Sequence, residues 1–291
     1  MAAASLAGDP PDTALNVMSE PELAAMRVAE GDRIVRRSGR HWRASFPGFY
    51  QPVDLLARMG AAELRQPAPV CWGFRAALAE PDAHLADASI PLHLLTDLPH
   101  FDEGALSRNR RSDLRRCRRQ VELRRLGDPR LLLEQGHAVF LSAVCRLGHW
   151  RALSEFEYRE RVRRRAAHRR RLVIAGLVDG TLRGWIDAYA VDGVLHTDEI
   201  FVASDALRSG IGTGLYVEAI LAGARQGLRA VCNGLHRPED ENLCRFKEGL
   251  GFRVVKLPAR MVMPTPVRAF LRSRRPATYY RLSGDAGDVR V

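Results

Sequence analysis

The feature that most constrains this chain is a glycine-rich turn between a predicted strand and a predicted helix. Residues 194–202 mix β-branched and aromatic side chains in a run short enough for a strand, and polar residues then break it. Gly210, Gly212 and Gly214 follow at two-residue spacing and lead into an apolar helical pattern. Glycines let successive backbone N–H groups approach a ligand, and the helix start adds a positive dipole end. The stretch therefore predicts a turn that binds a phosphate or a diphosphate.

Together with residues 242–252 (NLCRFKEGLGF), this stretch resembles the GNAT superfamily of acyl-CoA-dependent N-acyltransferases. In that family the turn usually reads Gln/Arg-x-x-Gly-x-Gly/Ala, and its amides hold the coenzyme A diphosphate. Leu207 occupies the Gln/Arg position here, and an arginine follows it. The resemblance implies acetyl-CoA or another acyl-CoA as co-substrate, with the thioester carbonyl held by amides of the strand. The residues that it assigns to this cofactor are Ile200, Phe201, Val202, Arg208, Ser209, Gly210, Ile211, Gly212, Thr213 and Gly214.

The order of the predicted elements after residue 121 is also that of the GNAT fold. It reads strand, two helices, three antiparallel strands, glycine turn, helix, strand, helix and strand. The fold class that this implies is α/β (α+β), with a mixed, mostly antiparallel central sheet flanked by helices. In this fold the strand before the turn and the next strand splay apart, and the acyl-pantetheine arm lies between them. The division that follows is a leader (1–16), an N-terminal accessory or abbreviated GNAT-like region (17–120), an acyltransferase domain (121–264) and a C-terminal tail (265–291).

The N-terminal region shows no catalytic motif. Its pattern predicts helices at 20–30 and 53–64, with strands near 70–74 and 91–96. Between the two helices, residues 41–50 are rich in aromatic side chains. We interpret them as a small core or a domain contact rather than as a substrate wall.

Lys247 lies where many GNAT enzymes place the Tyr that protonates the departing thiolate. The segment FKEGLGF (246–252) instead looks like the FK-x-x-x-G pattern of the Fem peptidyltransferases. Those proteins carry two GNAT-like halves, and in the Fem branch they draw the acyl group from aminoacyl-tRNA. The resemblance implies that Lys247 donates to an oxyanion or a phosphate, although a solvated helix residue is an equally good interpretation.

Three titratable residues on the strand before the turn are candidates for proton transfer. Acyl transfer to an amine needs a base for the amine proton and donors for the oxyanion. His196 and Asp198 share one strand face, and Glu199 takes the other unless a bulge intervenes. His196 is the first candidate for the catalytic base and Glu199 the second. The alternative is that each is a cross-strand or core-edge partner.

The chain is strongly basic, with 45 Lys and Arg against 34 Asp and Glu and a net charge of +11. Such a charge favours anionic partners such as coenzyme A, nucleic acid or a membrane surface. Arginines crowd two predicted helices, at 107–125 and 158–171. Aromatic residues do not interleave with them, so solvated helix faces are favoured over RNA contact.

The cysteines give no sign of a metal. The five cysteines are scattered and form no CxxC pair, so neither a disulfide framework nor a zinc site is predicted, and none has an evident His partner nearby in sequence. The first residues lack the pattern of a signal peptide, and no apolar run is long enough for a membrane span. A cytoplasmic location is therefore expected.

The leading hypothesis is an acyl-CoA-dependent N-acyltransferase, with acetyl-CoA as first choice of donor, that acts on an amine of a small molecule or peptide. The transferred group would then not be an aminoacyl group. Two alternatives remain open, namely a Fem-like transferase that uses aminoacyl-tRNA and a catalytically silent GNAT fold that serves as an interaction module. The sequence does not define the acceptor, the acyl chain or the oligomeric state.

Overall fold

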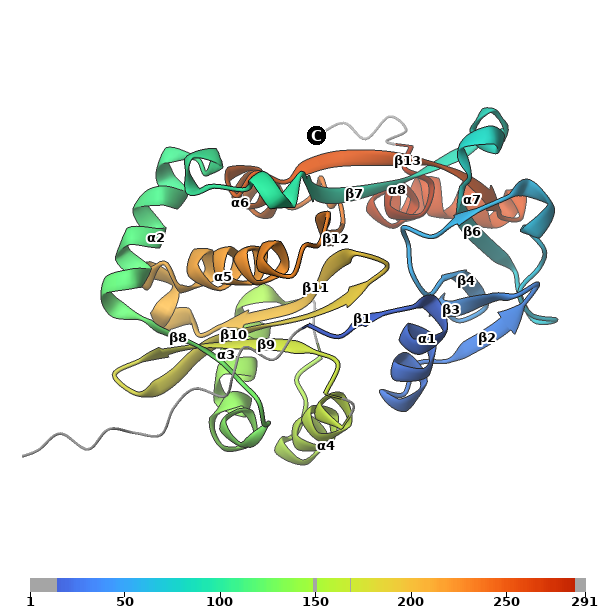
Figure 1. Cartoon of the computed structure of the whole chain (residues 1–291). Helices are drawn as coiled ribbons and strands as arrows, with labels where there is room; N and C mark the ends of the chain where they lie inside the picture. Colours follow the sequence, from blue (N-terminus) through green and yellow to red (C-terminus); the bar gives the residue numbers. More distant parts are fainter. Residues whose placement is uncertain (1–14, 149–150, 168, 286–291) are drawn as a thin grey trace, which may run out of the picture.

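The computed structural model describes residues 15–148, 151–167 and 169–285, which form thirteen paired strands with helices on both sides (Figure 1). The main path of the sheet runs β2-β3-β4-β6-β13-β7-β12-β11-β10-β9-β8, with β1 paired to β10 and β5 to β6. Most neighbours on this path are antiparallel, and the exceptions are β11 with β12 and β4 with β6. This mixed, mostly antiparallel sheet confirms the predicted fold class.

The second half of the chain follows the predicted order of elements. Its elements are β8 (Glu122–Arg125), the π-helical turn η5 (Leu132–Gly136), α3 (His137–Leu147), α4 (Glu155–Ala166), β9 (Leu172–Val178), β10 (Thr181–Val191), β11 (Val194–Val202), the 3₁₀ turn η6 (Ser204–Ser209), α5 (Ile211–Arg225), β12 (Ala230–Leu235), α6 (Glu241–Gly249) and β13 (Arg253–Val262). Two-residue Asp-Gly turns join β9 to β10 and β10 to β11, all with positive φ. This is the conformation that tight hairpins require.

Strands β11 and β12 diverge after a short parallel contact. Only Val194, Leu195 and His196 pair with β12, opposite Ala230 to Cys232. The rest of β11, which leads to the glycine turn, therefore has no backbone partner on that side. This confirms the splayed strands expected of a GNAT fold.

The N-terminal region contributes seven strands and two helices. They are β1 (Val17–Met18), α1 (Glu20–Ala29), β2 (Ile34–Arg37), β3 (Arg40–Phe46), β4 (Phe49–Pro52), β5 (Arg58–Met59), β6 (Gly73–Leu78), β7 (Ala88–Thr96) and α2 (Arg108–Gln120), with 3₁₀ turns η1 (Ala61–Glu63), η2 (Glu80–Leu85), η3 (Leu98–His100) and η4 (Glu103–Ala105). The aromatic stretch at 41–50 forms a hairpin from β3 and β4, and Trp42, Phe49 and Tyr50 are buried in the core as predicted.

The helix predicted at 53–64 is wrong. Asp54 accepts a hydrogen bond from the backbone of Leu56 (3.0 Å), which turns the chain, and β5 then pairs with β6. Short polar side chains that bond the backbone two residues on compete with helix formation. Burial of Met59 in the core around β6 provides the tertiary contact that a local pattern does not contain.

The two halves of the chain share the middle of the sheet. β7 lies between β12 and β13 and is antiparallel to both. β13 extends to Val262, because its second part pairs with β6 from Ala259 to Val262. The division between 17–120 and 121–264 stays a prediction, and the hydrogen-bonded sheet runs across it.

The segment after residue 264 forms two helices, α7 (Thr265–Arg274) and α8 (Pro276–Ser283). α8 packs on β7 and buries Tyr279, Tyr280 and Leu282. Arg75 of β6 is fully buried and donates to the backbone carbonyls of Arg281 and Leu282. Of the predicted leader, Leu15 is buried in the main core and residues 1–14 lie outside the described part.

The main core surrounds the splayed strands. α5 covers one face of β9, β10 and β11, while α3 and α4 lie on the other (Figure 1). α2 packs against α5 and against the 3₁₀ turn η6 that precedes it. The glycine turn and α2 therefore lie with α5 on one face of these strands, whereas α4 lies on the other (Figure 1).

Candidate active site

Helix α2 packs directly on the glycine turn. Gly210 has a φ of 79°, and a Cβ there would overlap the backbone carbonyl of Asp113. A Cβ on Gly214 would overlap the Sγ of Cys117, whereas one on Gly212 would meet only a ring atom of Phe246 at 4.0 Å. The packing of α2 thus accounts for two of the three glycines, and Gly212 alone faces open space.

Arginines of α2 reach the start of α5. Arg110 donates to the hydroxyl of Thr213 (3.4 Å), and its guanidinium lies 4.7 Å from the ring centre of Phe246. Arg116 donates to the carbonyl of Arg208 (2.8 Å). The first N–H groups of a helix have no acceptor within the helix, so those of Gly212 and Thr213 are available to an anion. Of the residues assigned to the cofactor, those from Arg208 to Gly214 therefore lie around the start of α5, beneath α2, while Ile200, Phe201 and Val202 lie on β11. Their binding of an anion stays a prediction.

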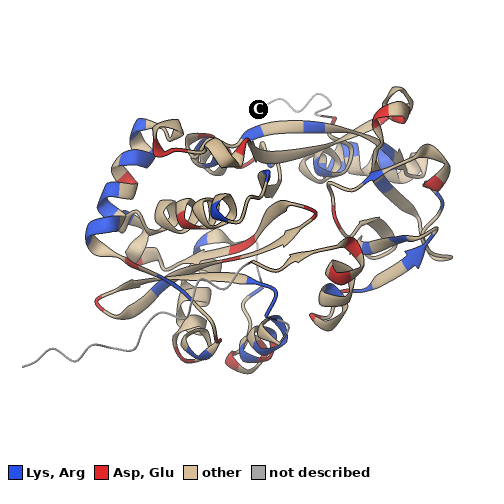
Figure 2. Ribbon diagram, viewed as in Figure 1, with Lys and Arg blue, Asp and Glu red and all other residues tan. Residues whose placement is uncertain are grey.

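The outer face of α2 is positively charged. Arg108, Arg115 and Arg119 are exposed, and no residue in the described part of the chain forms an ion pair with them. Figure 2 shows basic residues along this helix, at the end of the molecule opposite α7. A helix that packs on the turn through Leu114 and Cys117 thus presents free cations to solvent.

Lys247 is buried on α6, with 6% of its surface exposed. Its Nζ donates to the carbonyl of Asn233 (2.8 Å) in the irregular part of β12. Burial, followed by the charge of Arg237, lowers the pKa of Lys247 to about 8. The interpretation of this residue as a solvated helix position is therefore wrong, while its predicted chemical role stays a prediction.

His196 is enclosed between the two halves of the molecule. Its ring stacks on Tyr189, with 5.1 Å between ring centres, and its Nε2 lies 3.7 Å from Oδ1 of Asp54. Burial, followed by the charge of Arg27, lowers the pKa of His196 to about 4, although Asp198 opposes this. The residue is 8% exposed, and its Nε2 is buried without a hydrogen-bond partner in the described part of the chain.

A bulge in β11 puts Asp198 and Glu199 on the same cluster of arginines. Glu199 pairs with Asp187 of β10 and Thr197 with Ala188, so Asp198 is an extra residue on β11. This is the bulge that the sequence analysis allowed for when it placed Glu199 on the opposite strand face from Asp198. Both carboxylates lie close to the arginines of α4.

Asp198 is held by three cations. It accepts from Arg27 (3.1 and 3.2 Å), from Arg165 (2.6 Å) and from Arg171 (3.0 Å). Burial alone would raise the pKa of Asp198, but these three arginines hold it well below its usual range. A carboxylate with this many donors is a poor proton acceptor, and its position favours a structural role.

Glu199 faces a cavity of about 660 Å³ beneath α4. It pairs with Arg161 and with Arg165 (3.3 Å), and burial raises its pKa while the two arginines oppose the rise. Aromatic side chains of Tyr158, Trp185 and Phe201 form part of the wall. The arginines that line the cavity are Arg125, Arg161, Arg163, Arg165, Arg169, Arg170 and Arg171.

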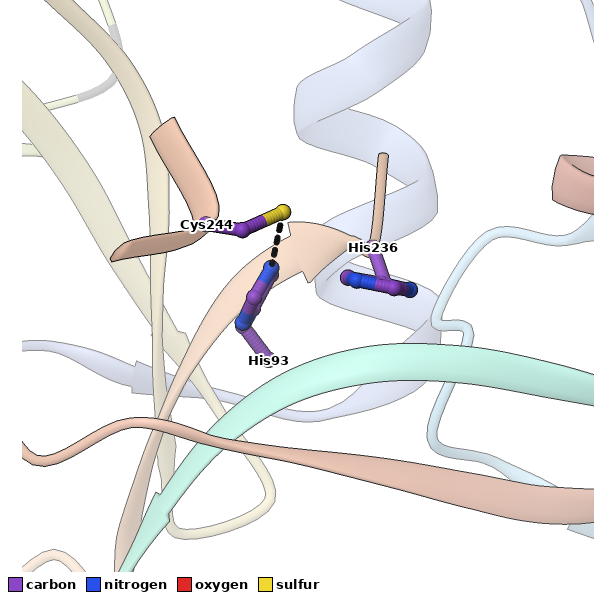
Figure 3. Close-up of side chains that lie close together, drawn as sticks. All are labelled: His93, His236 and Cys244. Carbon is purple, nitrogen blue, oxygen red and sulfur yellow. Dashed lines mark hydrogen bonds between the residues drawn. The ribbon is translucent and has the colours of Figure 1, made fainter. Parts of the chain in front are cut away.

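One cluster of side chains had no signal in the sequence. His93 of β7, His236 after β12 and Cys244 of α6 come together although they are far apart in sequence (Figure 3). The sequence spacings that indicate a metal site are two histidines within four or five residues of each other or a CxxC pair, and these three residues form neither. The Cys244 thiol and the His93 ring are 4.0 Å apart, so the expectation that no Cys has a His partner does not hold in space.

Three solved structures resemble nearly the whole chain. The C-terminal domain of a protein described as a lysylphosphatidylglycerol synthetase from Agrobacterium fabrum has a TM-score of 0.59 and 13% identity, and the match covers 91% of this chain and 98% of that one. FemX has a TM-score of 0.60 and 10% identity, with 90% and 95% covered. L-PGS from Bacillus licheniformis has a TM-score of 0.55 and 14% identity, with 89% and 98% covered.

At such identities these likenesses show the fold alone, which is a GNAT-like mixed sheet flanked by helices. No family model matches the sequence. A search of curated proteins found no significant match either. Among the described residues, no helix combines the length and the apolar character needed to cross a membrane.

Proposed function

We propose that this chain is a Fem-like transferase that takes its acyl group from aminoacyl-tRNA and passes it to a nucleophile of an acceptor. FemX and the lysylphosphatidylglycerol synthetases resemble it over nearly the full chain, and the FK-x-x-x-G segment around Lys247 supports the same branch. The Fem-like hypothesis, which the sequence placed second, therefore takes the first place. The acyl-CoA reading becomes the second candidate, and acetyl-CoA is no longer the preferred donor.

The observation that carries this proposal is the place of α2 on the glycine turn. Gly210 and Gly214 are needed for the helix to approach, which removes two of the three glycines as evidence for a bound diphosphate. The same helix presents Arg108, Arg115 and Arg119 to solvent beside the helix start of α5. Free arginines beside orphan N–H groups suit a ribose-phosphate backbone better than they suit one small cofactor.

The proposed chemistry is attack on the ester that links the acyl group to tRNA. The acceptor nucleophile bonds to the ester carbonyl carbon and its proton passes to a base. The C–O bond to the terminal ribose then breaks, the ribose oxygen takes that proton to become a hydroxyl, and uncharged tRNA leaves. We assign the base to Glu199, because it faces the cavity, whereas His196 is enclosed and Asp198 is fully paired. Lys247 stabilises the negative charge that develops on oxygen.

The acceptor site in this proposal is the cavity beneath α4. Arg163, Arg165, Arg170 and Arg171 of its wall are paired with carboxylates, whereas Arg169 is exposed and has no ion-pair partner among the described residues. The aromatic wall provides an apolar surface. An acceptor with an apolar body and an anionic group fits both features. We place the protein in the cytoplasm, where aminoacyl-tRNA is available.

The acyl-CoA alternative retains one specific observation. Gly212 faces open space, and its N–H and that of Thr213 can still hold a phosphate. Gly212→Val should therefore abolish coenzyme A binding with the fold intact, if this alternative is right. The same substitution should leave tRNA affinity nearly unchanged if the main contacts come from α2.

A ligand screen separates the hypotheses. The melting temperature of the full chain is measured with charged tRNA, uncharged tRNA, acetyl-CoA, a longer acyl-CoA and free coenzyme A, since a ligand of the native state raises it by mass action. A rise with charged tRNA alone supports the proposal. A rise with the coenzymes alone contradicts it, and no rise with any ligand favours a catalytically silent module.

A further inference from the structure

His93, His236 and Cys244 lie on three different elements and face one another (Figure 3). One ligand atom from each, a ring nitrogen or the thiol sulfur, lies within 4.8 Å of the others. The two imidazole rings meet edge to face, with 5.2 Å between their centres. His93 and Cys244 are buried and His236 is half-buried, so the cluster is shielded from solvent on most sides.

We propose that these three side chains bind a zinc ion. Two imidazoles and a thiolate are donors that Zn²⁺ prefers, and three protein ligands leave a fourth position for water. Zinc bonds of about 2.0–2.3 Å place tetrahedral ligand atoms roughly 3.5 Å apart. The cluster must therefore contract by about 1 Å from the present separations, which side-chain rotation of His236 on its non-strand segment can supply.

The hydrogen bonds around the cluster fit this role. Nδ1 of His236 lies 2.7 Å from the Tyr280 hydroxyl, so its Nε2 is free to bind a metal. Metal-bound histidines usually fix the ring through such a bond from the other nitrogen. Nδ1 of His93 is buried without a hydrogen-bond partner among the described residues, so of the two histidines His236 alone has this outer hydrogen bond.

Charges of both signs face the site. The charge of Lys247 acts on all three side chains and that of Lys256 on His236, and Lys247 is already engaged with the carbonyl of Asn233. Three carboxylates carry the opposite charge. Those of Glu239 and Glu248 act on His236, and those of Asp240 and Glu248 act on Cys244. Because the Cys244 thiolate cancels one charge of the ion, the bound site adds one positive charge, which these carboxylates face.

The ion would join three elements that surround the candidate active site. His93 belongs to β7, His236 follows β12, and Cys244 lies one turn before Lys247 on α6. Zinc at this point would fix α6 on the sheet and thereby the position of Lys247. Its role is positioning, and it holds whether the donor is aminoacyl-tRNA or acyl-CoA.

The test is metal binding by the full chain after removal of metal with a chelator. Zn²⁺ affinity is measured by competition with a chromophoric chelator, and Co²⁺ serves as a spectroscopic probe of the ligands. We expect one ion per chain and a thiolate-to-cobalt charge-transfer band. Cys244→Ser should abolish the band and weaken Zn²⁺ binding by more than the roughly 10- to 100-fold that loss of an outer hydrogen bond costs.

Two further variants make the result specific. Tyr280→Phe removes only the hydrogen bond to His236 and should weaken Zn²⁺ binding about 10- to 100-fold. Cys145→Ser changes an exposed cysteine and should leave affinity and spectrum unaltered. If Cys244→Ser does not fold, His236→Gln tests the same loss at a half-buried position. A folded wild-type chain that binds neither ion, or a Cys244→Ser variant that keeps the wild-type band, would overturn the proposal.

Discussion

The two segments that contain helices α2 and α4 carry similar numbers of arginines and use them differently. Nine arginines lie in residues 107–125 and eight in residues 158–171. On α4, Arg161 and Arg165 turn toward the sheet and bind carboxylates of β10 and β11. On α2, Arg108, Arg115 and Arg119 have no acidic partner among the described residues. The difference comes from the sheet, which offers carboxylates beneath α4 and none at the outer face of α2.

This contrast separates an arginine that holds the fold from one that is free to bind. Buried ion pairs are held by several hydrogen bonds, and the loss of one partner leaves a charge that no water can reach. Exposed arginines contribute little to folding and keep their full charge for a ligand. The predictions below test the assignment of α4 to structure and of α2 and its surroundings to binding.

The largest effect is expected for Arg165→Met on α4. The change leaves Asp187 and Asp198 with one fewer hydrogen-bonded cation, and such losses cost about 3–5 kcal/mol in the free energy of unfolding. Arg163→Met on the same helix removes an exposed pair with Glu160 and should cost at most about 1 kcal/mol. Urea denaturation measures both. Equal losses of unfolding free energy in the two variants would contradict the distinction between buried and exposed arginines.

The same network predicts how stability depends on acid. The folded pKa of Asp198 lies below its unfolded value of about 3.9, so its contribution is fully present above that value. The contribution is lost as pH falls through the folded pKa. Arg165→Met should bring the folded pKa closer to the unfolded one and reduce the loss of stability below about pH 4. An unchanged acid dependence in that variant would contradict this role.

On the α2 side, Lys247→Met should lower turnover about 10²- to 10³-fold, as does the loss of one donor to an oxyanion. The pKa of Lys247 is about 8, and the amine is charged below that value. Wild-type activity should therefore decline above about pH 8, and Lys247→Arg should move this decline to higher pH because guanidinium stays charged. Full turnover by Lys247→Met would remove this residue from the reaction.

A smaller effect tests the contact between α2 and the turn. Gly214→Ala would place a Cβ against Cys117 and should cost about 1–3 kcal/mol, as overpacked cores do. Cys117→Ala makes room, so the double variant should be more stable than the two single losses predict together. Gly212→Ala is the control, since its nearest neighbour is 4.0 Å away. Additive losses would mean that α2 does not press on Gly214.

Local pattern was enough for much of the fold. The three strands between 172 and 202, their Asp-Gly turns and the glycine turn follow from alternation and from residues that accept positive φ. The helix expected at 53–64 failed because Asp54 turns the chain and because β6 provides a partner far along the sequence. The length of β13 depends on the same strand.

The candidate site depends more on distant contacts. The sequence identified Lys247, Glu199 and the turn, but the burial of Lys247 and the bulge at Asp198 depend on how the strands align. The carboxylates that pair with the sheet-facing arginines of α4 lie on β10 and β11, and no local pattern links them to that helix. His93, 143 residues before His236, could not be linked to it by any spacing rule.

The most direct test of the transferase proposal is the salt dependence of charged-tRNA binding. Each phosphate contact adds about one unit to the slope of log affinity against log salt. Arg115→Gln with Arg119→Gln on α2 should therefore flatten the slope by about two units without loss of stability. Arg272→Gln with Arg274→Gln makes the same charge change on exposed arginines of α7 and should leave the slope unaltered. A chain that turns over acyl-CoA and binds charged tRNA no better in wild type than in the α2 variant would contradict the proposal.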